Sequence, residues 1–146
     1  MKKMLILLLL GMFLIVGCAT IQPLNTQSGK PEIVVKNLTK NEVKEILVNS
    51  WMQNGVCTLI SENDYQLVFR ENCGYNSFYS RVDLIFSFTI IKAGANIKII
   101  SDIKALINPG TINQVTYDKS RGGQVAEDVQ YLLKKDFHNY LSIFSY

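Results

Sequence analysis

The sequence has few of the side chains on which most metal sites and acid–base enzymes depend. It contains a single histidine, His138, and three cysteines, Cys18, Cys57 and Cys73. A zinc site uses about three or four Cys, His or carboxylate ligands, and two cysteines remote from one histidine do not supply them. No Ser or Cys has a base placed beside it in the sequence pattern. We therefore expect no metal, no cofactor and no enzymatic activity.

Two weaker candidate sites have ordinary explanations. Asp83 and Asp102 would lie on the same side of a central hairpin, but exposed strand carboxylates are common and seldom catalytic. Residues 119–123, Lys-Ser-Arg-Gly-Gly, precede a predicted helix, and free N–H groups at a helix start can bind an anion. A loop that simply leads into the helix gives the same pattern, so both interpretations stay open.

The sequence also lacks a basic cluster and a run long enough to span a membrane. Lys and Arg number 15 and Asp and Glu number 12, which gives a net charge of +3. No stripe of Lys or Arg marks a nucleic-acid surface, so we expect no nucleic-acid partner. The apolar run of residues 4–16 is too short for a transmembrane helix, which needs about 20 residues.

The start of the chain has the pattern of an export signal. Met-Lys-Lys precedes the apolar run, and a small residue, Gly17, stands before Cys18. Residues 15–18, Ile-Val-Gly-Cys, resemble the bacterial lipobox. The resemblance implies cleavage before Cys18 and attachment of lipid to this cysteine, which would then anchor the protein in a membrane. Several acyl chains on one residue would make the attachment permanent.

The resemblance also implies an address in the cell envelope. In Gram-negative lipoproteins an aspartate after the lipidated cysteine usually means retention in the inner membrane. Ala19 stands there, which favours the outer membrane on its periplasmic side. Removing residues 1–17 removes two lysines and no acid, so the net charge falls from +3 to +1 (3 − 2 = 1).

Composition divides the chain into three parts: a signal peptide at residues 1–17, a polar segment at residues 18–30 and one domain at residues 31–146. The polar segment, rich in Gln, Asn, Ser and Gly, predicts a tether that reaches about 40 Å when extended. An ordered extension packed on the domain is the alternative.

The domain begins with a predicted strand at residues 32–37 and a well-marked helix. Thr39 and Glu42 have the spacing of a capping box, in which each side chain bonds a free backbone N–H near the other. Val43 and the residues that follow at helical spacing form one apolar face. Asn-Gly at residues 54–55 predicts the end of the helix.

A first hairpin is predicted from residues 56–60 and 65–70, with Ile60 opposite Tyr65. In this register the inner face would carry Val56, Thr58, Ile60, Tyr65, Leu67 and Phe69. Cys57, Leu59 and Val68 would lie on the outer face. Cys73 continues the inner parity, so we predict that Cys57 and Cys73 are free thiols, with Cys57 the less accessible, although an oxidising compartment would permit a disulfide.

A longer hairpin follows, formed by residues 79–91 and 96–107. Pairing Lys92 with Ile97 collects the apolar residues of both strands on one side, with Phe88 opposite Ser101. A short strand is predicted at residues 113–117. A final amphipathic helix is predicted to begin near residues 121–124 and to continue through Phe144.

These elements predict an α+β domain in the order β-α-β-β-β-β-α: an antiparallel sheet of four to five strands with two helices packed on one face. Residues 28–32, 64–69 and 108–110, together with the lipobox, resemble segments of a group of small uncharacterised bacterial envelope lipoproteins. That group has no assigned activity, so the resemblance implies fold and location alone.

The predicted function is that of a non-enzymatic envelope lipoprotein, attached to the membrane through Cys18, that docks on another envelope protein. The outer face of the sheet, with Ile85 and Ile100, is the predicted partner surface. The alternative is a small apolar ligand bound between the last helix and the sheet. Its predicted lining residues are Phe86, Phe88 and Phe137.

Overall fold

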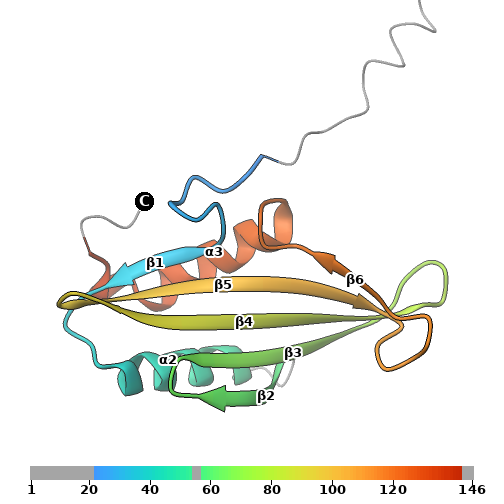
Figure 1. The fold of residues 1–146 in the computed structure, drawn as a ribbon, viewed down its shortest axis with the longest axis horizontal. Coiled ribbons are helices and arrows are strands. Elements are labelled where there is room, and N and C mark those ends of the chain that lie inside the picture. The colour runs from blue at the N-terminus through green and yellow to red at the C-terminus, as the bar shows by residue number, and fades with distance from the viewer. Residues whose placement is uncertain (1–21, 54–56, 143–146) are drawn as a thin grey trace, which may run out of the picture.

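The computed structural model describes residues 22–53 and 57–142, and these form an α+β fold in which two helices cover one face of an antiparallel sheet (Figure 1). In chain order the elements are β1 (Glu32–Val35), α2 (Lys40–Met52), β2 (Cys57–Asn63), β3 (Gln66–Tyr75), β4 (Arg81–Ala93), β5 (Asn96–Ile107), β6 (Val115–Asp118), α3 (Gln124–Asp136) and a 3₁₀ turn, η1 (His138–Tyr140). The predicted fold class is confirmed.

The sheet has the strand order β1-β5-β4-β3-β2, and all its strand pairs are antiparallel. The predicted short strand at residues 113–117 is present as β6, which also pairs with β5 and brings the sheet to six strands. β1 and β6 pair with different halves of β5, so they follow one another along the same edge (Figure 1). β2 forms the opposite edge.

Helix α2 begins as its sequence predicts. The Thr39 hydroxyl accepts a hydrogen bond from the Glu42 N–H, and the Glu42 carboxylate accepts one from the Thr39 N–H at 2.7 Å. The capping box satisfies backbone donors that the first helical turn leaves free. Val43 and Leu47 then point into the core. The predicted stop at residues 54–55 lies outside the described residues.

The core lies between the helices and the inner face of the sheet, which we define as the face that α2 and α3 cover. The register predicted for the central hairpin is confirmed, with Lys92 opposite Ile97 and Phe88 opposite Ser101. Strict alternation over both long strands leaves no other pairing that buries the apolar side chains. The buried inner-face residues of β4 and β5 are Phe86, Phe88, Ile90, Ile97, Ile99, Ser101, Ile103 and Ala105.

The register predicted for the first hairpin is wrong. Asp64 and Tyr65 form a two-residue turn in which the Asn63 side chain accepts a hydrogen bond from the Tyr65 N–H at 2.9 Å. A bulge between Leu59 and Ser61 then shifts the pairing, so that Leu59 lies opposite Phe69. Ile60 and Tyr65 are exposed, and Val56 lies outside the described residues.

The same shift reverses the face assigned to two residues. Cys57 pairs with Glu71 and is buried in the core cluster, and Leu59 packs against that cluster. The predicted register puts both residues on the outer face, so this part of the prediction is wrong. Of that predicted outer set, Val68, Ile85, Ile91 and Ile100 keep the parity of the face opposite the helices, which we call the open face.

Several element bounds also differ from the prediction. β1 ends at Val35, because Asn37 adopts a left-handed backbone with φ of +60°. β4 begins at Arg81, after the left-handed Tyr79. Helix α3 begins at Gln124, as predicted, but ends at Asp136, where the Phe137 N–H caps it through the carbonyls of Leu133 and Lys135. Phe144 lies outside the described residues.

Candidate functional site

No group of three or more His, Cys, Asp or Glu side chains able to hold a metal comes together within residues 22–53 and 57–142. His138 is exposed beyond the end of α3, with its Nδ1 2.9 Å from the Lys135 carbonyl oxygen. Asp83 and Asp102 share the open face but lie four residues apart in register, since Asp83 is opposite Leu106 and Asp102 is opposite Ser87. They do not form a carboxylate pair.

Asp83 has a different role from the one considered in the sequence. It is completely buried, and its carboxylate forms ion pairs with Arg70 on β3 and Arg81 on β4. The two guanidinium groups are half-exposed. Buried carboxylates are paired because an isolated charge away from water is costly. This cluster of one carboxylate and two arginines could not be found from the sequence, because its members come together only through the strand register.

The open face carries the two predicted partner-binding residues. Ile85 and Ile100 are both half-buried there, and their register neighbours are polar: Arg70 and Lys104 flank Ile85, and Thr89 and Glu32 flank Ile100. The apolar side chains of this face therefore alternate with polar ones and do not form one continuous patch. A mixed composition of this kind is what whole non-obligate interfaces usually have.

The three residues of the predicted ligand pocket, Phe86, Phe88 and Phe137, are buried side chains of the core. Trp51 of α2 lies over the two strand residues, with ring centroids 4.8 Å from Phe86 and 4.9 Å from Phe88. Trp51 is half-buried, as expected for an aromatic residue on an amphipathic helix. The side chain that covers these rings is therefore a tryptophan on α2, whereas the predicted pocket lay beside α3.

A surface hollow of about 360 Å³ lies at the beginning of α3, and Lys119, Arg121, Gly122 and Gly123 line it as the sequence suggested. Asp118 lines it as well. Hydrogen bonds from Ser120 hold the pKa of Asp118 below its ordinary value, so this carboxylate is charged at neutral pH. The hollow therefore presents an anion together with its cations and glycine N–H groups.

The segment predicted as a tether is packed on the domain over residues 24–31, which we call the leader. Leu24 lies against the core cluster, and the N–H groups of Gln27 and Ser28 donate to the Glu32 carboxylate at 3.0 and 3.2 Å. Lys30 forms an ion pair with Asp102 on β5. The expectation of a free tether up to residue 30 is therefore corrected: the alternative, an ordered extension, describes this segment. Cys18 lies outside the described residues.

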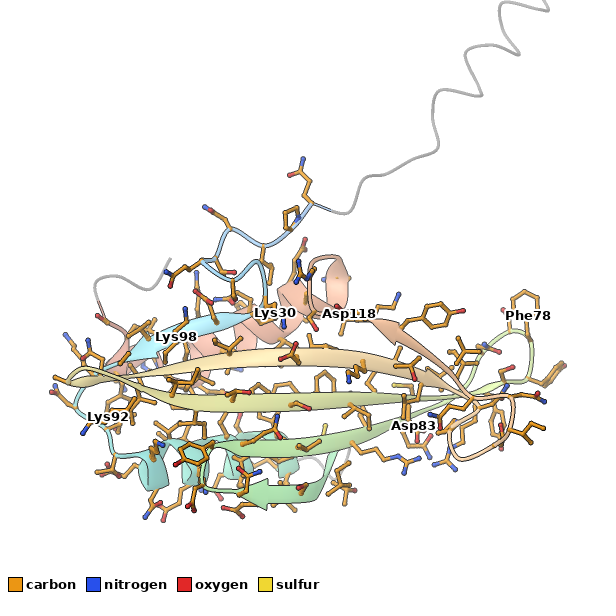
Figure 2. All side chains as sticks on the ribbon, in the orientation of Figure 1. Lys30, Phe78, Asp83, Lys92, Lys98 and Asp118 are labelled. Atoms are coloured by element: carbon orange, nitrogen blue, oxygen red, sulfur yellow. The ribbon has the colours of Figure 1, made fainter. Side chains whose placement is uncertain are left out.

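One end of the sheet carries unusually exposed apolar side chains. The loops of residues 76–80 and 108–114 both lie at this end (Figure 1), which we call the loop end. Phe78 is 85% exposed, Tyr79 is 89% exposed and Ile112 is 99% exposed. Figure 2 shows Phe78 projecting beyond the strands. Sequence reasoning did not single out these residues, because turn composition identifies a loop without showing that two loops lie together.

The remaining thiols are free, with Cys57 buried and Cys73 exposed. Burial, followed by the charge of Glu71, raises the pKa of the Cys57 thiol to about 11. Burial also raises the pKa of Cys73. Both thiols are therefore largely protonated at neutral pH, whereas the thiolate is the form a catalytic nucleophile needs.

No helix in the described part of the chain is both long and apolar enough to cross a bilayer. No protein-family model, curated protein or solved structure matches this chain.

Proposed function

We propose that this chain is a lipid-anchored bacterial envelope protein, held in the membrane through Cys18, whose domain is a non-enzymatic module that docks on another envelope protein. The lipobox resemblance of residues 15–18 supports the anchor, and Ala19 supports the outer membrane on its periplasmic side. The observation that carries the docking function is the open face of the sheet, opposite the face covered by α2 and α3.

The open face is suited to a protein partner because it is held in one shape. Three ion pairs hold down its charged side chains: Lys98 with Glu32, Lys30 with Asp102, and Arg70 with Asp83. Ile85 and Ile100 lie half-buried between such groups. A partner that covers them would bury apolar area without ordering a loop first, which lowers the entropic cost of binding.

The apolar-ligand function is the weaker candidate. It needs Phe86, Phe88 and Phe137 to line an open space, whereas the exposed fractions of these three residues are 3%, 0% and 0%. A ligand could reach their rings only if the helices moved away from the sheet.

The anchor is tested by Cys18→Ser in the full-length chain. We expect this variant to lose lipid attachment and signal cleavage. Cleaved Cys18→Ser protein that still fractionates with membranes and resists salt extraction would contradict lipid anchoring.

Docking is tested by capture of partners with the lipidated protein carrying Ile100→Lys. The matched control is Tyr131→Lys on α3, because Tyr131 is exposed on the opposite side of the molecule. We expect the first variant to lose a partner that the parent and the control both retain. Equal capture by all three proteins would contradict docking through the open face, and unfolding of the Ile100→Lys domain would show that this face is core.

A further inference from the structure

We propose that the loop end of the sheet inserts Phe78, Tyr79 and Ile112 into the surface of the lipid bilayer to which the chain is anchored. The inference deepens the proposed function, because it rests on the anchor at Cys18. The inserted side chains lie at the loop end and not on the open face, and the Arg70–Asp83–Arg81 cluster lies where the two surfaces meet.

The two loops are uncharged and expose three large apolar side chains. Residues 76–80 are Asn-Ser-Phe-Tyr-Ser and residues 108–114 are Asn-Pro-Gly-Thr-Ile-Asn-Gln, so neither loop carries a charged side chain. Phe78, Tyr79 and Ile112 are almost fully exposed. Inserting such side chains recovers hydrophobic free energy without moving a charge out of water. Aromatic residues, with an apolar ring and in Tyr a polar hydroxyl, are enriched at bilayer interfaces.

Phe78 and Tyr79 are exposed on a loop that hydrogen bonds hold in one conformation. The Asn76 side chain accepts hydrogen bonds from the N–H groups of Phe78 and Ser80, each at 2.9 Å. Tyr79 is held with φ of +56°, a left-handed backbone that is unfavourable for a bulky side chain. Strained residues of this kind are concentrated at functional sites. The loop is therefore set in a shape that turns two aromatic rings towards solvent.

The second loop is ordered in the same way and is joined to the first. The Gln114 side chain accepts from the Gly110 N–H at 2.8 Å, and the Thr111 hydroxyl donates to the Asn108 carbonyl at 2.9 Å. At the base of the loops the Asn108 N–H donates to the Arg81 carbonyl at 2.8 Å. The two loops thus form one end surface, carried by the longest strand pair of the sheet.

The charges behind the loops complement lipid phosphates. Arg70 and Arg81 share the buried Asp83 carboxylate, so the cluster has a net charge of +1 (2 − 1), with both guanidinium groups half-exposed. Figure 2 shows Asp83 near the same end as Phe78. When the aromatic rings enter the interface, the arginines near the base of the loops lie at the depth of the headgroups. Anionic phosphate attracts them there.

The anchor and the ordered leader keep the loop end close to the bilayer. Four residue steps separate Cys18 from Gln22, which limits their distance to about 14 Å. Lys30 is pinned to Asp102, and β5 rises about 17 Å from Asp102 to Ile107 at the base of the loops. A domain held this closely cannot stand far from the surface, and the loop end lies within reach of it. A second contact with the bilayer, made by the loop end in addition to the lipid anchor, would fix the orientation of the domain.

A bilayer fits this end better than a protein does. The end consists of two protruding loops that are joined at their base (Figure 1), whereas a stable protein interface needs about 800 Å² of matched surface on each partner. Protruding apolar side chains with two arginines near the base of their loops need only a fluid surface that closes around them.

The test uses the full lipidated chain in vesicles of phosphatidylethanolamine and phosphatidylglycerol with brominated acyl chains, which quench tryptophan on contact. Phe78→Trp and Ile112→Trp place the probe at the loop end. Tyr131→Trp is the control, because Tyr131 is an exposed aromatic residue on α3. Trp51 is the only native tryptophan and is half-buried, so its emission is the common background and also reports that each variant is folded.

We expect the added emission of Phe78→Trp and Ile112→Trp to shift to the blue and to be lost in brominated vesicles, while that of Tyr131→Trp is retained. Loop-end probes quenched no more than the control, in protein that floats with the vesicles, would overturn the inference and leave the anchor intact. Protein that stays in solution would overturn both. Loop-end emission that changes only when another envelope protein is added would assign this end to a protein and would also overturn the inference.

Discussion

Truncation of Phe88 tests whether the space between the sheet and the helices is a filled core. The ring is fully buried, opposite Ser101, and lies 4.9 Å from Trp51 and 5.9 Å from Phe69 between centroids. Replacing a buried Phe by Ala costs about 3–5 kcal/mol in the free energy of unfolding. Aromatic pairs are worth about 0.5–1.5 kcal/mol beyond their buried area, which keeps Phe88→Ala away from the lower end of that range, at about 4 kcal/mol.

The measurement is urea denaturation followed by far-ultraviolet circular dichroism. With an m-value of about 2 kcal/mol per molar urea, a loss of about 4 kcal/mol lowers the midpoint by about 2 M. Thr89→Ala is the matched control, because Thr89 is the next residue of β4 and lies half-buried on the open face. We expect its cost to be at most about 1 kcal/mol.

The comparison separates two descriptions of the same residue. If Phe88 lined an open ligand pocket, its truncation would enlarge a space that already exists and would cost little more than Thr89→Ala. Similar midpoints for the two variants would therefore refute the argument that the helices pack directly on this side of the sheet.

The remaining predictions concern the helix cap, the thiols and one carboxylate. Thr39→Ala should lower the free energy of unfolding by about 1 kcal/mol, and an unchanged denaturation midpoint would show that the cap does not stabilise α2. In native protein a maleimide should modify Cys73 and spare Cys57 until the domain is unfolded, because Cys73 is exposed and Cys57 is buried with a pKa of about 11. Failure to label either thiol after unfolding without reductant would reveal a disulfide instead. Burial acts to raise the pKa of Glu32, but hydrogen bonds and the Lys98 ammonium outweigh it, so the folded pKa lies below the ordinary 4.5. The ionised carboxylate therefore stabilises the fold above about pH 4.5, and this stability is lost as pH falls through the lower folded pKa. Glu32→Gln should therefore flatten the dependence of the denaturation midpoint on pH below about 5.

The sequence by itself determined the elements whose signals are local and repeated. Thr39 and Glu42 specify the start of α2, because a capping box involves residues three positions apart. The register of β4 with β5 follows from alternation over two long strands, because a slip of one residue would expose the apolar face of both. From these signals come the α+β class and the placement of both helices on one face.

The tertiary structure alone decided the features that depend on a contact between distant segments. A turn at Asp64 and Tyr65 together with one bulge places Cys57 and Leu59 in the core. The short strand β2 has too little alternation of apolar and polar residues to predict this register. A polar composition also gave no sign that the leader would pack on the sheet, because its hydrogen bonds go to Glu32 and its ion pair to Asp102. The burial of Asp83 and the meeting of two loops at one end of the sheet have the same origin: each depends on which strands become neighbours, and neighbouring strands are chosen by the whole core.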